Sequence, residues 1–264
     1  MLQIINSYHT HTKRCGHASG EDEEYVLAAI KLGIKELGFS DHIILPKGFE
    51  QPGVRGSYDL LEDYLNSINH LKEKYKDQIK IYVGFEAEYY PPLIDYYKEL
   101  LNHKIDFLIL GQHCCMKDGH LCWYYSREPK IEEVHKYVDD VLEGLKTGLF
   151  KYLCHPDLFM RAFEKWNEGL EKESRRLLKG CEELNIPIEL NICGTRHPGY
   201  KGYNHSYTNH HFFDLVNDYH LKIVMGMDAH DPSHLSLQEL KKGEEFVERH
   251  NLVVDMDYRL FPKD

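Results

Sequence analysis

Short apolar runs alternate along the chain with longer segments in which apolar residues recur every three or four positions. The runs predict buried β-strands, and the longer segments predict amphipathic helices. The runs occupy 2–5, 35–40, 79–88, 105–113, 151–155, 186–191 and 221–228. Helical patterns begin near residues 19, 57 and 91, cover 131–148 and 168–184, and begin again near residues 212 and 236. Seven alternating strand–helix units predict a parallel sheet with crossover helices.

Polar side chains with metal-binding chemistry follow most of the predicted strands. His9 and His11 are two residues apart just after the first strand, so both imidazoles should point to one space. They are either half of a metal site or two polar residues at a strand end. The later strands end in further candidates, which favours the metal site; these are Asp41, His42, Glu86, Glu88, His113, His155, Asp228 and His230, with His17 beyond the first strand.

The number of strands that end in such residues decides between two architectures. An open sheet builds its site at one switch point from a few strands, whereas a closed barrel brings every carboxyl end around one centre. Candidate metal ligands lie at the ends of six of the seven predicted strands, so the sequence favours a barrel with its site on the C-terminal face. We therefore expect one α/β domain over residues 1–264, with seven strands rather than eight.

Composition and charge exclude several classes of partner. The formal charge of −11 argues against a surface that coats nucleic acid, although a local basic pocket for a small anion remains possible. No apolar stretch approaches the length of a membrane helix, and the N-terminus lacks a signal pattern. The seven cysteines form no Cys-x-x-Cys pair and favour reduced thiols in a cytoplasm. The oligomeric state is left open.

The motifs resemble those of the PHP (polymerase and histidinol phosphatase) superfamily. The resemblance spans nearly the whole chain and is carried by His9-Thr-His11 with His17, Ser40-Asp-His42, Gly84-Phe-Glu86, Gly111-Gln-His113, Cys154-His-Pro156 and Met227-Asp-Ala-His230. It implies a distorted TIM-like (β/α)7 barrel with two to three divalent ions. The implied ligands are His9, His11, Glu86 and Asp228 for the first ion, Glu86, His113 and His155 for the second, and His17, His42 and His230 for the third.

The resemblance also implies a reaction and a substrate. A hydroxide bridging two ions would attack the phosphorus of L-histidinol phosphate, a step of histidine biosynthesis, to give L-histidinol and phosphate. Nitrogen and oxygen ligands suit Zn, Mn or Fe, and the sequence does not choose among them. Asp228 and His230 are the catalytic candidates, and Asp231 is an alternative proton donor. A nucleotide, oligonucleotide or phosphotyrosyl protein is the alternative substrate, and a metal-binding scaffold without turnover is a third reading.

Three further residues are candidates for substrate binding. Arg161 and Arg196 leave the fifth and sixth strands, and guanidinium groups bind phosphate oxygens in bidentate fashion. In the alternative reading both are solvated loop residues. Glu88 could meet a cationic group of the substrate, or it could be a salt-bridged carboxylate behind the ligands. His197 and His205 are in a loop expected to overhang the site.

Overall fold

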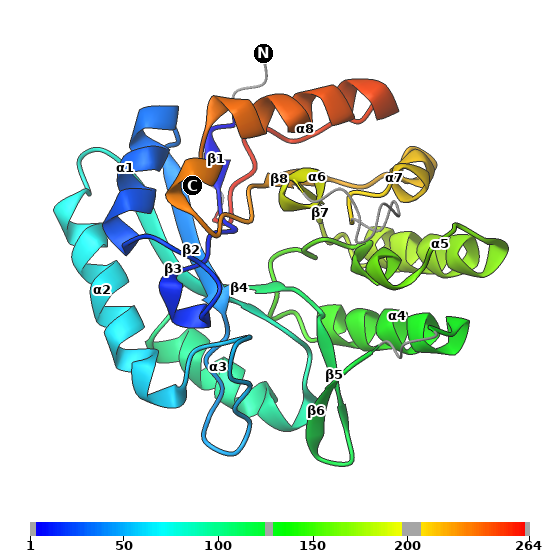
Figure 1. The fold of residues 1–264 in the computed structure, drawn as a ribbon, viewed down its shortest axis with the longest axis horizontal. Coiled ribbons are helices and arrows are strands. Elements are labelled where there is room, and N and C mark those ends of the chain that lie inside the picture. Colours follow the sequence, from blue (N-terminus) through cyan, green and yellow to red (C-terminus); the bar gives the residue numbers. More distant parts are fainter. Residues whose placement is uncertain (1–3, 125–128, 197–206, 262–264) are drawn as a thin grey trace.

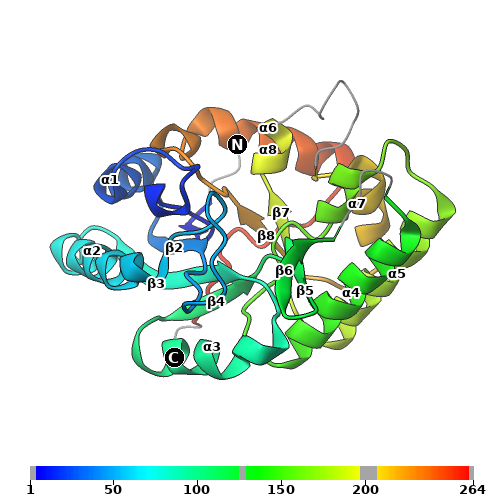
Figure 2. The same cartoon turned by 60° about the horizontal axis from the view of Figure 1, so that its bottom comes forward.

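A curled sheet of parallel strands lies at the centre of the molecule, with helices around its outside (Figures 1 and 2). The computed structural model describes residues 4–124, 129–196 and 207–261, except for the side chain of Arg196. Among these residues, no helix is long and apolar enough to cross a membrane.

The strands pair in chain order. β1 (Asn6–Ser7), β2 (Glu36–His42), β3 (Lys80–Ala87) and β4 (Phe107–Leu110) form one parallel sheet, and β7 (Ile188–Asn191) pairs in parallel with β8 (Ile223–Gly226). Single parallel bridges join Leu110 to Leu153, Leu153 to Ile188, and Thr10 to Ala229. The first two bridges connect β4 to β7 through the segment at Leu153, and the third connects β8 to the segment after β1. The carboxyl ends of all these parallel segments therefore face the same side.

The helices pack an apolar stripe against this sheet. In α4, for example, Val134, Val138 and Val141 are buried while Glu132 and Glu143 are exposed. The helices are α1 (Asp22–Leu32), α2 (Leu61–Lys74), α3 (Ile94–His103), α4 (Ile131–Lys146), α5 (Glu168–Glu183), α6 (Cys193–Arg196), α7 (His210–Val216) and α8 (Leu237–His250).

The structure differs from the predicted elements in three places. The first strand begins at Asn6 rather than within residues 2–5, of which residues 2 and 3 are outside the described part. The strand predicted at 151–155 is reduced to two isolated bridges at Leu153, one to Leu110 and one to Ile188. An antiparallel hairpin that was not predicted, β5 (Cys114–Lys117) with β6 (His120–Trp123), follows β4. Its turn residues, Asp118 and Gly119, have positive φ angles of 50° and 79°, which match the Asp-Gly signal of a tight hairpin.

The end of the sheet away from the site is closed by the C-terminal segment. Leu260 packs there in one buried cluster with Tyr8, Tyr82 and Phe107. Glu36 accepts a hydrogen bond from the Tyr8 hydroxyl at 2.6 Å and pairs with Arg259. This end is therefore occupied mainly by apolar and aromatic side chains, and the candidate ligands lie at the opposite end of the sheet.

Candidate metal centre

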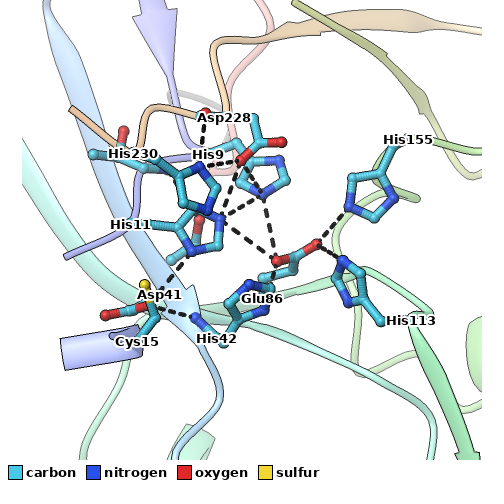
Figure 3. A network of polar contacts seen from close by, with 12 residues as sticks. His9, His11, Cys15, Asp41, His42, Glu86, His113, His155, Asp228 and His230 are labelled. Atoms are coloured by element: carbon cyan, nitrogen blue, oxygen red, sulfur yellow. Dashed lines mark hydrogen bonds and ion pairs between the residues drawn. The ribbon is translucent and has the colours of Figure 1, made fainter. Parts of the chain in front are cut away.

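The carboxyl ends of the parallel segments bring the predicted ligands into one network. Figure 3 shows His9, His11, Glu86 and Asp228 at its centre, with His42, His113, His155 and His230 around them. His9, His11, Glu86 and Asp228 are each at most 3% exposed. The strands thus deliver four donor groups to a buried space from three separate parts of the chain.

Five distances between donor atoms of this network are close to those that tetrahedral coordination of an ion requires. The Nε2 atoms of His9 and His11 are 3.2 Å apart, and each is 3.6 Å from Glu86 Oε2. Asp228 Oδ1 is 3.6 Å from His9 Nε2 and 3.2 Å from His11 Nε2. Ligands about 2.0–2.1 Å from a common centre would stand about 3.3–3.4 Å apart. These five distances therefore suit a divalent ion held between the four groups.

Glu86 is shared between two groups of histidines. Its Oε2 faces His9 and His11 and is 3.1 Å from His42 Nδ1. Its Oε1 is 2.7 Å from His155 Nε2 and 3.5 Å from His113 Nε2. One carboxylate with histidines on both oxygens has the arrangement of a ligand that bridges two ions.

A third group of histidines adjoins this pair of sites. Ligand atoms of His11, His42 and His230 all lie within 4.8 Å of one another. The exposed ring of His17 lies 5.2 Å from His42 and 5.0 Å from His230, measured between ring centroids. The residues expected around a third ion are thus close together, and His11 stands between them and the first group.

The outward nitrogens of several histidines are held by oxygen acceptors. His9 Nδ1 is 2.8 Å from Glu189 Oε1, and His113 Nδ1 is 3.3 Å from Glu88 Oε1. His17 and His230 direct Nδ1 toward backbone carbonyls, those of Cys15 and Asp228. Such contacts fix the tautomer and leave Nε2 free to face a metal. The orientation therefore suits ligation on the inner side.

The charges within the network favour ionised carboxylates. Burial alone would raise the pKa of Glu86, but His113, His9 and His42 hold that pKa well below its usual range. Burial likewise opposes ionisation of Asp228, whose pKa is nevertheless held well below its usual range by His9 and His230. Both carboxylates are therefore negative, as metal ligands must be.

Two glycines make room for the carboxylates. A Cβ atom on Gly111 would lie 1.8 Å from Glu86 Oε1, and one on Gly226 would lie 1.7 Å from Glu189 Oε1. Real atoms cannot approach so closely, so any side chain at these positions would displace the carboxylate. The glycines that follow β4 and end β8 are therefore part of the site.

Two of the predicted ligands adopt strained backbone. His155 has φ of 26° and Asp228 has φ of 45°, in a region that residues other than glycine seldom occupy. Each such residue costs about 1–3 kcal/mol, and strain of this kind gathers at functional sites. The backbone conformation that points these two side chains into the network is therefore locally unfavourable.

Tyr207 and Arg161 lie at the rim of the network. The Tyr207 hydroxyl donates to Asp228 Oδ2 across 3.4 Å, and its ring lies 5.4 Å from that of His155. The exposed Arg161 places its guanidinium carbon 5.8 Å from the Tyr207 ring centroid. Arg161 thus stands near the ligands with its side chain open to solvent.

Other predicted residues fall outside the described part of the chain or take a different role. Arg196 ends α6, and its side chain is not described; His197 and His205 also lie outside the described residues. Asp231 caps a short 3₁₀ helix and accepts hydrogen bonds from Ser19 and Ser233, which lower its pKa to about 2. So acidic a carboxyl is a poor proton donor near neutral pH.

Glu88 is a salt-bridged carboxylate in this structure. Its two oxygens accept from Arg55 at 3.1 and 2.8 Å, and Oε1 also faces His113. Arg55 and Glu88 are 3% and 1% exposed. In this structure Glu88 therefore matches the alternative expectation, a salt-bridged carboxylate behind a ligand, and its contact with a cationic group of the substrate stays a prediction.

The sequence reasoning missed the supporting residues Arg55, Glu189 and Asn191. Glu189 also accepts from the backbone N–H of His155 at 3.0 Å and from Asn191 Nδ2 at 2.7 Å. The signal was present in Ile188-Glu-Leu-Asn191, where polar residues alternate within a buried strand and must share one face. Arg55 lies in an irregular loop, where no local sequence pattern indicates that its side chain forms a buried ion pair.

A curled parallel sheet with histidines and carboxylates gathered at its carboxyl edge defines an α/β protein built to bind divalent metal ions. The chain belongs to the PHP domain family, whose model matches residues 7–193.

Similar proteins extend along most of the chain. The histidinol-phosphatase of Bacillus subtilis (strain 168) is 24% identical over 249 residues, which cover 84% of this chain and 92% of that protein. A Deinococcus radiodurans protein named "Probable histidinol-phosphatase" is 24% identical over 246 residues, covering 87% and 88%. The crystal structure of histidinol phosphate phosphatase from Lactococcus lactis, complexed with zinc, L-histidinol and phosphate, has a TM-score of 0.71, 18% identity and 96% coverage of both chains. Its fold matches that of this chain.

Proposed function

We propose that this protein is a metal-dependent phosphomonoesterase that hydrolyses L-histidinol phosphate to L-histidinol and phosphate. The observation that carries the proposal is the four-atom cage of His9, His11, Glu86 and Asp228, with Glu86 shared with His113 and His155. Relatives named for this activity match the chain over most of their own length, which supports the choice of substrate.

The finer architecture belongs to the same proposal. With the segment at Leu153 counted beside β1, β2, β3, β4, β7 and β8, the parallel segments number seven, as in a (β/α)7 barrel formed by one domain. We assign two to three ions of Zn, Mn or Fe to the nine ligands named from the sequence. The seven cysteines are free, which supports a reducing, cytoplasmic setting.

Each group of residues would have a separate task in the reaction. Bound divalent ions would supply a nucleophile from water at neutral pH and positive charge beside the phosphate oxygens. Arg161 and Arg196 would bind the phosphate from the rim. Asp228 and His230, whose Oδ1 and Nδ1 atoms are 3.2 Å apart, would hold or move protons beside the reacting phosphate. The Tyr207 hydroxyl donates a hydrogen bond to Asp228.

The test of the proposal is phosphate release by the purified protein, combined with analysis of its metal content. We expect two to three divalent ions per chain and much faster release from L-histidinol phosphate than from nucleotides, oligonucleotides or phosphotyrosyl peptides. Comparable rates on all of these esters would contradict the substrate assignment while leaving the metal centre intact.

Removal of the metal separates an enzyme from a scaffold. Incubation with a chelator should abolish phosphate release, and added Zn, Mn or Fe should restore it, because the cage has no other source of a nucleophile at neutral pH. The melting temperature should fall in parallel, since bound metal stabilises the folded state. A loss of thermal stability with no activity before or after treatment would support the scaffold reading.

Replacing Arg161 by alanine should raise KM for the ester by about tenfold or more, since hydrogen bonds to charged groups contribute about 1.5–3 kcal/mol. The value of kcat should change less if the guanidinium binds ground-state phosphate. Arg175→Ala is the matched control, because Arg175 pairs with Glu171 and Asp218 on the outer surface. An unchanged KM in Arg161→Ala would instead support the alternative reading, in which Arg161 is a solvated loop residue.

A further inference from the structure

Two cysteines face each other across the hairpin that follows His113. Cys115 of β5 and Cys122 of β6 are partners in the antiparallel register, and their Sγ atoms are 3.2 Å apart. Residues directly opposite in such a pair have Cα atoms about 4.5–5.5 Å apart, within the range of about 4.4–6.8 Å that a disulfide spans. A bond between them would require the sulfur atoms to approach, with the backbone already in place.

The surroundings of the hairpin hold this register. Gln112 donates to the carbonyl of Cys114 at 3.0 Å and to the Tyr124 hydroxyl at 2.9 Å, at the open end of the hairpin. Tyr124 in turn donates to Asp140 on α4 at 2.6 Å. The residues of β6, His120–Trp123, are exposed or half-buried, so this strand is open to small molecules. The two thiols are therefore held together, and that of Cys122 can be reached.

The two thiols differ in exposure and therefore in reactivity. Cys115 is 6% exposed. Cys122 is only half-buried. Because the thiolate is the reacting form and access limits the reaction, Cys122 should meet an oxidant first.

We propose that Cys115 and Cys122 are a reversible oxidation site that closes to a disulfide on reaction with a small-molecule disulfide such as oxidised glutathione. The Cys122 thiolate attacks one sulfur of the oxidant, whose S–S bond breaks and releases one glutathione thiolate. Cys115 loses its proton to solvent and attacks Cys122 Sγ, which releases the second glutathione thiolate. Two protein thiols are oxidised, and one glutathione disulfide is reduced to two thiols.

The experiment treats the full-length protein with oxidised glutathione, blocks the remaining thiols with iodoacetamide and maps the tryptic peptides by mass spectrometry. Trypsin cleaves after Lys117, between the two cysteines, so the disulfide would join two peptides that dithiothreitol separates. We expect this linked pair in the wild type. We expect Cys115→Ser to accumulate a glutathione adduct on Cys122, and Cys122→Ser to leave Cys115 unmodified.

Cys181→Ser is the matched control, because Cys181 is buried in α5 away from the hairpin, and this variant should still form the linked pair. The proposal is overturned if both thiols of the wild type are alkylated after oxidation. It is equally overturned if a glutathione adduct persists on Cys122 with Cys115 present. Cys114 lies in the same tryptic peptide as Cys115, so fragmentation of the linked wild-type pair must place the bond on Cys115. A bond from Cys114 to Cys122 would overturn the proposal, and this result holds even if one variant does not fold.

Discussion

Replacing Glu86 by glutamine is expected to lower kcat for L-histidinol phosphate by more than about a hundredfold. Loss of a residue that only orients a metal ligand costs about 10–100-fold in activity or metal affinity. Glu86 is itself a proposed ligand, and its two oxygens face the other proposed ligands His9, His11, His113 and His155. Glutamine keeps the size of the side chain but removes the negative charge between the histidines. Metal content should fall together with kcat.

The matched control for this variant is Glu99→Gln, because Glu99 is exposed on α3. We expect kcat and metal content of this control to equal those of the wild type. A Glu86→Gln protein that keeps its metal and turns over within a few-fold of the wild type would contradict the shared-ligand assignment.

The second large effect is expected on stability. Arg55→Met should lower the free energy of unfolding by about 3–5 kcal/mol, because it leaves the buried carboxylate of Glu88 without its cation. Burial alone would raise the pKa of Glu88, and Arg55 is the principal group that instead lowers it. Activity should fall as well, since Glu88 faces Nδ1 of His113. Urea unfolding at neutral pH measures the difference.

An exposed ion pair provides the comparison. Lys76 and Glu73 pair at the surface with 64% and 76% of their side chains exposed, so Lys76→Met should change stability by less than about 1 kcal/mol. If Arg55→Met and Lys76→Met lowered the free energy of unfolding by the same amount, the buried Arg55–Glu88 pair would contribute no more to stability than an exposed pair. If the double variant Arg55→Met, Glu88→Leu recovered stability but not activity, the pair would act by positioning His113.

The parts of the site that could be predicted from the sequence are those tied to strand periodicity. His9 and His11 share a face because they are two residues apart, and Glu86 and Asp228 follow apolar runs long enough to identify as strands. Any fold that aligns parallel strands brings the ends of those strands together. The proximity of the candidate ligands could therefore be predicted without knowing the exact strand lengths. The shift of β1 to Asn6 and the shortened pairing at Leu153 did not disturb it.

The parts that could not be predicted depend on contacts between distant loops. Arg55 meets Glu88 from an irregular segment, and Glu189 meets His9 across 180 positions of the chain. Local patterns describe which residues can bond, whereas tertiary packing decides which of them do.

The most direct test of the metal centre is anomalous X-ray diffraction from crystals grown with Zn or Mn. The structure predicts an anomalous peak between His9, His11, Glu86 and Asp228, about 2.0–2.1 Å from both Nε2 atoms when Zn is bound, and a second peak between Glu86, His113 and His155. The absence of a peak among these side chains, in protein that releases phosphate from L-histidinol phosphate, would contradict the assignment.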